Sequence, residues 1–226
     1  MRDFDLTYCI GDVHGCHSLL RELLGLIRDD ANGQAHRLVF LGDLIDRGVD
    51  SAGVVRTVRD IQADRPEEVV CLKGNHEEML LQVIDGTAAA SWWTANGGDA
   101  TLKAYGVRRA SRLPGDVVAW MRALPTSYED PLRVFVHAGL QPGIALDRQD
   151  DDTKLWMREP FLSSEYDFGK HVVHGHTPVP SGQPDHRSWR TNLDTGAVYG
   201  GPLTAAVFTD EQAGPVDIIQ VKRTRS

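Results

Sequence analysis

The sequence predicts an α/β fold in which helices pack on a parallel β-sheet. Three observations support this prediction. Strand-like and helix-like apolar patterns alternate along the first third of the chain, a short polar motif follows each strand-like run, and 226 residues are enough to bury one large core. Parallel strands need a crossover connection, usually a helix, so the alternation favours a parallel sheet over hairpins. We expect residues 1–226 to form one domain.

Apolar periodicity places the elements of the first third. Leu6–Ile10 is a short apolar run typical of a strand, and Ser18–Arg28 carries leucine and isoleucine at helical spacing. The same alternation then repeats twice. We expect strands at Arg37–Leu41 and Glu68–Leu72, and helices at Ser51–Gln62 and Glu77–Ile84.

The middle of the chain is predicted to be helical and the last part to be rich in strands. Ala88–Leu124 contains the aromatic stretch "SWWTANGGDATLKAYG" and the amphipathic "PGDVVAWMRALP", and we expect Trp92 and Trp93 to lie in the core. From Leu132 onward strands dominate, and the last two, "LTAAVF" and "VDIIQV", are joined by "TDEQAGP", which is typical of a hairpin.

A long stretch between these strands shows little regular pattern. Gln141–Lys170 spans roughly thirty residues, and a loop of that length in a compact domain indicates a functional loop over the site. The acidic run Asp150, Asp151 and Asp152 within it is most simply interpreted as a solvated loop.

Charge and cysteine usage exclude several classes of protein. The net charge of −8 and a pI near 5.5 argue against a dedicated binder of nucleic acid or anionic membranes, which would display a basic surface. The three cysteines, Cys9, Cys16 and Cys71, favour buried free thiols in a reducing compartment over a disulfide framework. The start "MRDFDLTYCI" lacks a signal-peptide pattern, and no apolar run approaches the ~18 residues of a membrane span. We therefore expect a cytoplasmic protein.

Short polar motifs stand at the ends of the predicted strands. "GDVHG" follows Ile10, "GDLIDRG" follows Leu41 and "GNHE" follows Lys73, while two later strands add "VHAG" and "VHGHTP". The loops beyond the carboxyl ends of parallel strands converge on one crevice, where ligands bind. We expect five strand ends to bring together Asp12, His14, Asp43, Asp46, Asn75, His76, His137 and a histidine of the last motif, His174 or His176.

Such a set of side chains could bind cations. Carboxylate, imidazole and amide ligands without thiolate suit manganese, iron or zinc. Asp12 and His14 are two residues apart, so in extended backbone both point to the same face and could bind one ion. Asp43 is the candidate for bridging two ions about 3.5–4 Å apart. The alternative makes each aspartate a turn former or cap, and Asn75 in particular the cap of the following helix, but five motifs at successive strand ends favour the site.

The order of the motifs resembles a known family. D-x-H, G-D-x-x-D-R-G, G-N-H-E, H-A-G-L and G-H-T-P together resemble the calcineurin-like metallophosphoesterases, specifically the phosphoprotein phosphatase branch with its bacterial and phage serine/threonine phosphatases. The resemblance runs from Ile10 to about Gly201. It implies a four-layer αββα sandwich with two mixed β-sheets and helices outside, with the site at the C-terminal ends of the strands.

The resemblance also implies roles for individual residues. It implies two divalent metal ions, manganese first and zinc, iron or nickel as alternatives. It assigns one ion to Asp12, His14 and Asp43, and the other to Asp43, Asn75, His137 and His176. His76 is then the proton donor, Asp46 orients it, and Arg47 is a phosphate clamp.

Three further positions stand beside this pattern. His176 is preferred to His174 as a ligand because the family pattern fixes the histidine immediately after Gly175, and His174 stays a candidate for a supporting contact. Relatives often carry arginine where this chain has Lys73, and lysine supplies charge without the planar fork of arginine. Asp194 in "NLDTG" resembles a family loop that closes the site, although it is first interpreted as a turn residue.

The chemistry of phosphate esters fits these roles. Two cations lower the pKa of a shared water enough to give hydroxide near neutral pH, so a metal-bridging hydroxide can attack phosphorus without a protein nucleophile. The leaving alkoxide needs a proton, which a histidine held by a carboxylate can supply. Arg47 and a second arginine, for which Arg158 in "LWMREPF" is the candidate, would bind the remaining oxygens. Arg158 could equally form a surface ion pair with Glu159 or Asp152.

The sequence leaves three functions open. The leading one is a serine/threonine-type protein phosphatase, whose partner is a phosphoprotein or phosphopeptide, with no nucleic acid and no membrane. The rival enzyme is a symmetrical dinucleoside-tetraphosphate hydrolase, although the short chain and the form "HGHTP" favour the phosphatase. The third is a catalytically idle scaffold, against which the intact Asp46, His76 and six predicted ligands argue.

Overall fold

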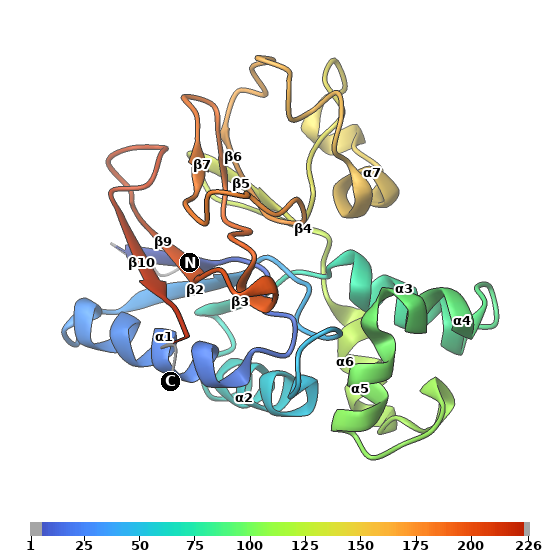
Figure 1. Ribbon diagram of the computed structural model, residues 1–226. Helices are drawn as coiled ribbons and strands as arrows, with labels where there is room; N and C mark the ends of the chain where they lie inside the picture. The colour runs from blue at the N-terminus through green and yellow to red at the C-terminus, as the bar shows by residue number, and fades with distance from the viewer. Residues whose placement is uncertain (1–5, 224–226) are drawn as a thin grey trace.

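Two five-stranded mixed sheets pack face to face in the computed structural model, which describes residues 6–223 (Figure 1). The first sheet has the order β10-β9-β1-β2-β3. Its parallel strands are β1 (Leu6–Ile10), β2 (His36–Phe40) and β3 (Val69–Cys71), and the antiparallel hairpin β9 (Leu203–Thr209) and β10 (Asp217–Val221) extends it beside β1. The segment Met1–Asp5, the start of the stretch in which no signal-peptide pattern was found, lies outside the described residues.

The second sheet has the order β4-β5-β6-β8-β7. Its parallel strands are β5 (Arg133–Val136), β6 (His171–His174) and β8 (Arg190–Asn192), with β4 (Ser127–Glu129) and β7 (Asp185–His186) antiparallel at the edges. The prediction of an α/β fold with two mixed sheets is therefore confirmed.

Alternation along the strands separates two apolar layers. Tyr8 and Ile10 of β1 pack against α1 (His17–Ala31) and α2 (Ser51–Asp64), which cover the outer face of the first sheet. Cys9 points the other way, into the apolar layer between the sheets, where Phe135 and Val173 come from the second sheet. This period of two is what a sheet buried on both faces requires.

Four short helices form a separate group beside the sheets, shown in green in Figure 1: α3 (Asn75–Ile84), α4 (Ala90–Trp93), α5 (Asp99–Ala104) and α6 (Gly115–Ala123). A π-helical turn, Thr94–Gly98, joins α4 to α5, and a 3₁₀ turn, Ala110–Arg112, precedes α6. Trp93 is 1% exposed in the core of this group, as predicted, but Trp92 is 39% exposed, so its prediction as a core residue was wrong.

The outer layer over the second sheet is formed by the segment between β5 and β6. Gln141–Lys170 was expected to have little regular structure, but it contains the 3₁₀ turn Leu146–Arg148 and the helix α7 (Asp151–Trp156). Asp150 caps α7 by accepting a hydrogen bond from the Thr153 amide at 2.7 Å, so the prediction of a loop at this acidic run was wrong. Phe161 anchors the segment on Val134 and Val172 of the sheet.

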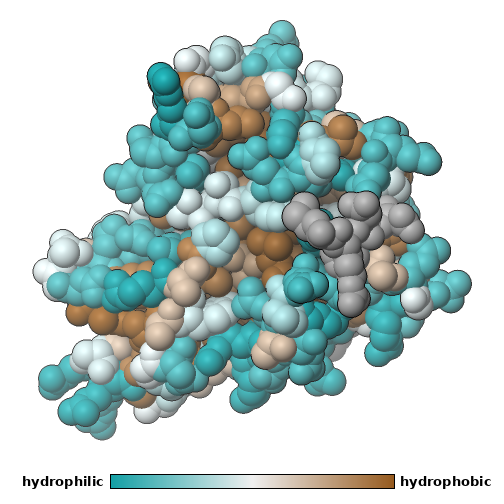
Figure 2. All heavy atoms as spheres, turned by 180° about the vertical axis from the view of Figure 1, so that it is seen from behind, coloured by the Kyte–Doolittle hydropathy of each residue, from teal (hydrophilic) through white to brown (hydrophobic). Residues whose placement is uncertain are grey.

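The remaining sequence predictions concern cysteines and membranes. Cys9, Cys16 and Cys71 are buried free thiols, as predicted. Within residues 6–223 no helix has the length and apolar character needed to cross a bilayer. Hydrophilic side chains cover most of the face opposite to that of Figure 1, with apolar residues visible between them (Figure 2).

Candidate metal centre

The polar residues that follow the strands come together at the carboxyl ends of the parallel strands of both sheets. They enter from the loops after β1, β2, β5 and β6 and from the first turn of α3. All of them are at most 7% exposed, and they are Asp12, His14, Asp43, Asp46, Asn75, His76, His137 and His176. Buried charged groups persist only when paired or bound to cations, so this cluster needs a specific explanation.

Tight turns bring these loops together. Gly42 has a φ of +97°, and a Cβ there would lie 2.4 Å from the Gly74 amide nitrogen, so only glycine lets the loop after β2 touch the start of α3. A Cβ on Gly175 would lie 2.1 Å from Asp12 Oδ1. His14 has a φ of +43°, so the expectation that Asp12 and His14 share a face because both are extended was wrong.

Glu77 fixes the loop that carries Asp43. Its carboxylate accepts hydrogen bonds from the backbone amides of Asp43 at 2.9 Å, Gly74 at 2.8 Å and Leu44 at 2.9 Å. Burial, and then the charge of Asp43, raises the pKa of Glu77 to about 7. No role for Glu77 was expected from the sequence. The available signal was its position three residues after Gly74, where a glutamate completes a capping box.

The first group of possible ligands is Asp43, His137 and His176, whose ligand atoms lie within 4.8 Å of one another. Asn75 lies between the two histidines, with its Oδ1 2.8 Å from His137 Nε2 and 2.8 Å from His176 Nδ1. The N-cap of α3 is Gly74, so Asn75 is not the helix cap that the alternative interpretation required.

The tautomer of His137 makes this group suitable for a cation. Its Nδ1–H donates to the Leu41 carbonyl at 2.9 Å, so its Nε2 presents a lone pair to the amide oxygen of Asn75. Burial lowers the pKa of His137, and it lowers the pKa of His176 to about 2, so both rings are neutral. Two acceptors that face each other without a proton between them fit a shared cation.

The second group is His14, Asp43 and His76, whose ligand atoms also lie within 4.8 Å of one another. His14 donates through Nδ1 to the Ile45 carbonyl at 2.8 Å and turns Nε2 toward Asp43 Oδ2 at 3.3 Å. Asp43 Oδ1 is 3.5 Å from His137 Nε2, so one carboxylate faces both groups. Burial alone would raise the pKa of Asp43, but the positive charge of the imidazoles of His137, His76 and His14 in their protonated forms holds it well below its ordinary value. A cation bound between neutral rings supplies the same positive charge.

Asp12 belongs to neither group among the described residues. Its two oxygens lie 3.1 and 3.2 Å from the His176 amide nitrogen, which donates to them. Burial, followed by the charges of Asp194 and Asp43, raises its pKa well above the ordinary value. Burial also raises the pKa of Asp194 to about 6. Buried carboxylates that repel one another in this way favour a bound cation.

His76 belongs to the second ligand group and also contacts Asp46. Its Nδ1 is 2.7 Å from Asp46 Oδ2, and its Nε2 is 4.0 Å from Asp43 Oδ2. Asp46 thus contacts one ring nitrogen and Nε2 faces the cluster. That Asp46 orients His76 for catalysis stays a prediction. Two residues that the sequence analysis missed, Trp93 and Thr101, also donate to the Asp46 carboxylate, and no polar motif at a strand end points to them.

The two arginines lie at different depths. Arg47 is half-buried and contacts His14 Nε2 through Nη1, with its guanidinium 5.7 Å from the centre of the Tyr199 ring. Arg158 is exposed just after α7, and its charge is one of the causes that lower the pKa of His176. In the part of the chain that the structure describes, Arg158 forms no ion pair with Glu159 or Asp152, so that alternative was wrong.

The other positions singled out by sequence lie around the cluster. Lys73 pairs with Glu78 at 3.4 Å. His174 is fully buried, donates toward the Gly175 carbonyl at 3.2 Å and is absent from both ligand groups. Asp194 accepts from the Gly196 amide at 3.1 Å, which confirms its role in a turn.

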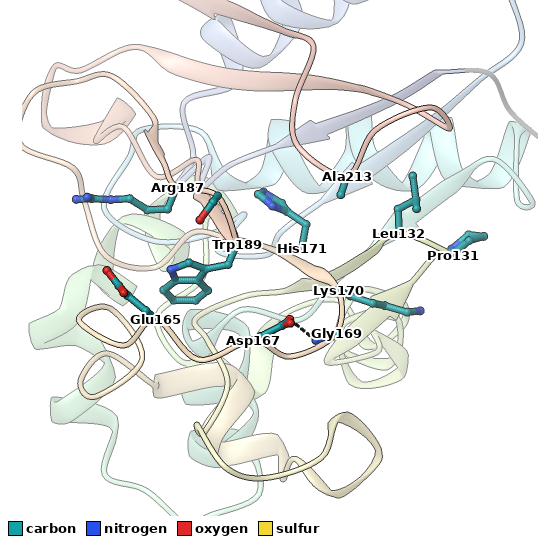
Figure 3. A pocket seen from close by; sticks show the side chains of 11 residues that line it. Pro131, Leu132, Glu165, Asp167, Gly169, Lys170, His171, Arg187, Trp189 and Ala213 are labelled. Carbon is teal, nitrogen blue, oxygen red and sulfur yellow. Dashed lines mark hydrogen bonds between the residues drawn. The ribbon is translucent and has the colours of Figure 1, made fainter.

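A surface pocket of about 680 Å³ lies elsewhere, at the amino ends of β5 and β6 (Figure 3). Lys170, His171, Arg187 and Trp189 are among the residues that line it, and none of the candidate ligands does. The pocket is therefore at the opposite end of the second sheet from the cluster.

Known proteins resemble the chain over nearly its whole length. The sequence pattern of the family described as Calcineurin-like phosphoesterase matches residues 7–209. Serine/threonine-protein phosphatase 1 of Salmonella typhimurium is 32% identical, over 88% of this chain and 90% of its own length. The asymmetrical bis(5'-nucleosyl)-tetraphosphatase PrpE of Oceanobacillus iheyensis is 27% identical, over 90% of this chain and 88% of its own length.

Two further similarities concern tetraphosphatases. A symmetrical bis(5'-nucleosyl)-tetraphosphatase of Nitrosospira multiformis is 30% identical over 62% of this chain and 46% of its own length. A crystal structure described as a candidate diadenosine tetraphosphatase has a TM-score of 0.74 and 26% identity, over 99% of this chain and 96% of that one. The family match over residues 7–209 contains every residue of the cluster.

Proposed function

The chain belongs to the calcineurin-like phosphoesterase family, and we propose that it removes phosphate from phosphoserine or phosphothreonine in proteins. The observation that carries this proposal is the Asp43 carboxylate, which faces a ligand group on each side. A relative named as a serine/threonine phosphatase that matches along 90% of its own length supports the choice of substrate.

The proposed metal ligands divide around Asp43. One divalent ion would be held by Asp12, His14 and Asp43, and the second by Asp43, Asn75, His137 and His176. When bound, two such ions lower the pKa of water and neutralise phosphoryl oxygens. Manganese is our first choice, because the ligands are carboxylate, imidazole and amide groups and include no thiolate.

The chain's own residues would then bind the ester and protonate the leaving group. Asp46 accepts a hydrogen bond from the Nδ1–H of His76, so the proton that His76 gives to the leaving oxygen is the one on Nε2, the atom that faces the cluster. Arg47 and Arg158 would bind the phosphoryl oxygens that stay on phosphorus, since a guanidinium pairs with two oxygens at once.

A second candidate function is hydrolysis of a dinucleoside tetraphosphate. It is favoured by the PrpE relative, which matches 88% of its own length, and by the structural neighbour with a TM-score of 0.74. The same cluster serves either substrate, because both reactions break a bond between phosphorus and oxygen.

A direct comparison of substrates tests the proposal. The full chain with added Mn²⁺ is assayed with a phosphoserine peptide, a phosphothreonine peptide and diadenosine tetraphosphate, and His137→Ala serves as the inactive control. We expect kcat/KM for at least one phosphopeptide to exceed that for diadenosine tetraphosphate by about tenfold or more, a discrimination of ~1.4 kcal/mol. Preference for the dinucleotide would overturn the substrate assignment. Two ADP molecules would then indicate symmetrical cleavage, and AMP with ATP asymmetrical cleavage. If neither substrate nor p-nitrophenyl phosphate is hydrolysed, the scaffold hypothesis replaces the enzyme.

A further inference from the structure

The Asp46 carboxylate has more side-chain donors than the orientation of one histidine requires. Oδ2 accepts from His76 Nδ1 at 2.7 Å and from Trp93 Nε1 at 2.8 Å, and Oδ1 accepts from Thr101 Oγ1 at 2.6 Å. Asp46, Trp93 and Thr101 are 0%, 1% and 0% exposed. Both carboxylate oxygens are therefore fixed, and no water competes for them from the surface.

Two of these donors come from the group of helices α3–α6, far from Asp46 in the sequence. Trp93 ends α4, 47 positions after Asp46, and Thr101 lies in α5, 55 positions after it. Thr101 also accepts from the Asp46 amide at 2.9 Å, and Asp46 has a φ of +73° that an L residue adopts only at a cost. Ser51 Oγ also accepts from this amide at 3.1 Å, so the segment holds the side chain of Asp46 and shares its backbone amide with Ser51.

The segment Trp93–Thr101 is shaped for these contacts. A π-helical turn at Thr94–Gly98 separates Trp93 from Thr101, and such turns recur at functional sites. A Cβ on Gly98 would lie 2.3 Å from the indole of Trp93, so glycine is what lets the ring lie across the turn. Gly97 accepts from the Arg47 amide at 3.0 Å, and with its φ of +104° a Cβ there would lie 2.6 Å from Arg47 Cγ.

We propose that Trp93 and Thr101 are positioning residues, which lock the Asp46 carboxylate so that it holds His76 in the orientation for proton transfer to the leaving group. The proposal rests on the proposed function of His76. A carboxylate held by His76 alone could rotate about its Cβ–Cγ bond, and the imidazole would follow it. Donors on both oxygens stop this rotation, and the oxygen shared by His76 and Trp93 uses both of its lone pairs. Neither residue would touch the substrate or a metal ion.

The kinetic test uses two esters that differ in how much they need an acid. In Trp93→Phe, which keeps an aromatic ring and removes the N–H, we expect kcat for phenyl phosphate to fall about tenfold to a hundredfold, the effect of losing a hydrogen bond to a charged group. For p-nitrophenyl phosphate, whose leaving group needs little protonation, we expect a fall of about threefold or less. Thr101→Val should behave in the same way, and Thr101→Ser should keep most of the activity.

Two controls separate positioning from a general structural role. Trp120→Phe is the matched control, because Trp120 Nε1 also donates a hydrogen bond, to Gln62 Oε1 at 2.7 Å, and this bond does not involve the cluster. The substitution should leave kcat for both esters unchanged. In a His76→Asn background, Trp93→Phe should add no further loss, because its effect passes through His76. Equal losses for the two esters, or a full additional loss in that background, would overturn the proposal.

A second readout needs no activity. In metal-free protein, the indole N–H proton of Trp93 should exchange slowly with solvent. Asp46→Asn should change the chemical shift of its ¹H–¹⁵N resonance and leave that of the Trp120 indole unchanged. A Trp93 indole resonance with the same chemical shift in Asp46→Asn as in the parent protein would also overturn the proposal. If the protein hydrolyses neither ester although this resonance responds, the proposed function has failed and the hydrogen bond to Asp46 stands.

Discussion

Replacing His76 by asparagine separates its two possible roles, proton donor and metal ligand. Its ligand atom lies in the same group as those of His14 and Asp43, so geometry alone allows either role. Asparagine can keep a donor near the position of Nδ1, which is 2.7 Å from Asp46 Oδ2, and it lacks an equivalent of Nε2. The substitution therefore removes the transferable proton and preserves the contact with Asp46.

The expected magnitude follows from the position of the ring. His76 is 1% exposed, so no bulk water reaches its place to deliver the proton instead. General acid catalysis contributes about 10²–10⁴-fold, which is ~2.7–5.4 kcal/mol of barrier at about 1.36 kcal/mol per factor of ten. We expect kcat for phenyl phosphate to fall by this factor, and kcat for p-nitrophenyl phosphate to fall less.

The assay compares the two esters and the metal content of the same samples. Steady-state kcat is measured with saturating Mn²⁺, and bound manganese is counted by mass spectrometry after removal of free ions. We expect the manganese content of His76→Asn to equal that of the parent protein. Loss of manganese from His76→Asn would make His76 a ligand, and equal losses for both esters would remove it from the proton-transfer step.

Three further predictions address the backbone, the ligands and the pH dependence of stability. Gly42→Ala should lower the free energy of unfolding in urea by ~2 kcal/mol or more, because φ is +97° and its Cβ would meet Gly74, whereas Gly86→Ala, at a φ of +76° with open space around it, should cost ~1 kcal/mol. Asn75→Leu should weaken Mn²⁺ binding in calorimetry by at least ~10-fold, because it removes the oxygen between His137 and His176. Burial lowers the pKa of His171 from 6.5 to about 4, so the unfolded state binds more protons in that range, and the free energy of unfolding should fall as the pH falls from 6.5 to 4 and fall less in His171→Gln.

Each of these predictions has a result that contradicts it. Equal losses of unfolding free energy in Gly42→Ala and Gly86→Ala would show that the loop at Gly74 moves to accommodate the added Cβ. An unchanged affinity in Asn75→Leu would exclude that amide as a ligand. Parallel pH profiles for His171→Gln and the parent, both measured without metal, would mean that His171 does not titrate with a lowered pKa.

The strands and the cluster were predictable because their signals are local. The apolar run Leu6–Ile10 matches β1, and Arg37–Leu41 differs from β2 by one residue at each end, since burial continues beyond the last ladder pair. The polar motifs that follow these strands needed only the rule that parallel strands end at one edge. That the chain forms one domain over residues 1–226 stays a prediction.

The contacts that the sequence analysis missed depend on tertiary structure. Trp92 and Trp93 are adjacent on a helix of four residues, too short for a periodic pattern to show that one is buried and that the other stacks on Trp156 at 6.0 Å. The helix α7 has six residues, and its capping aspartate was hidden within an acidic run. The hydrogen bonds of Trp93 and Thr101 to Asp46 join residues 47 and 55 positions apart, and no local sequence pattern connects them.

If the Asp43 carboxylate is shared by two cation sites, anomalous diffraction from crystals soaked in Mn²⁺ should locate an ion on each side of it. We expect two anomalous peaks, one with Asn75, His137 and His176 around it and the other with Asp12 and His14 around it. A single peak, or peaks that do not contact Asp43, would contradict a shared carboxylate.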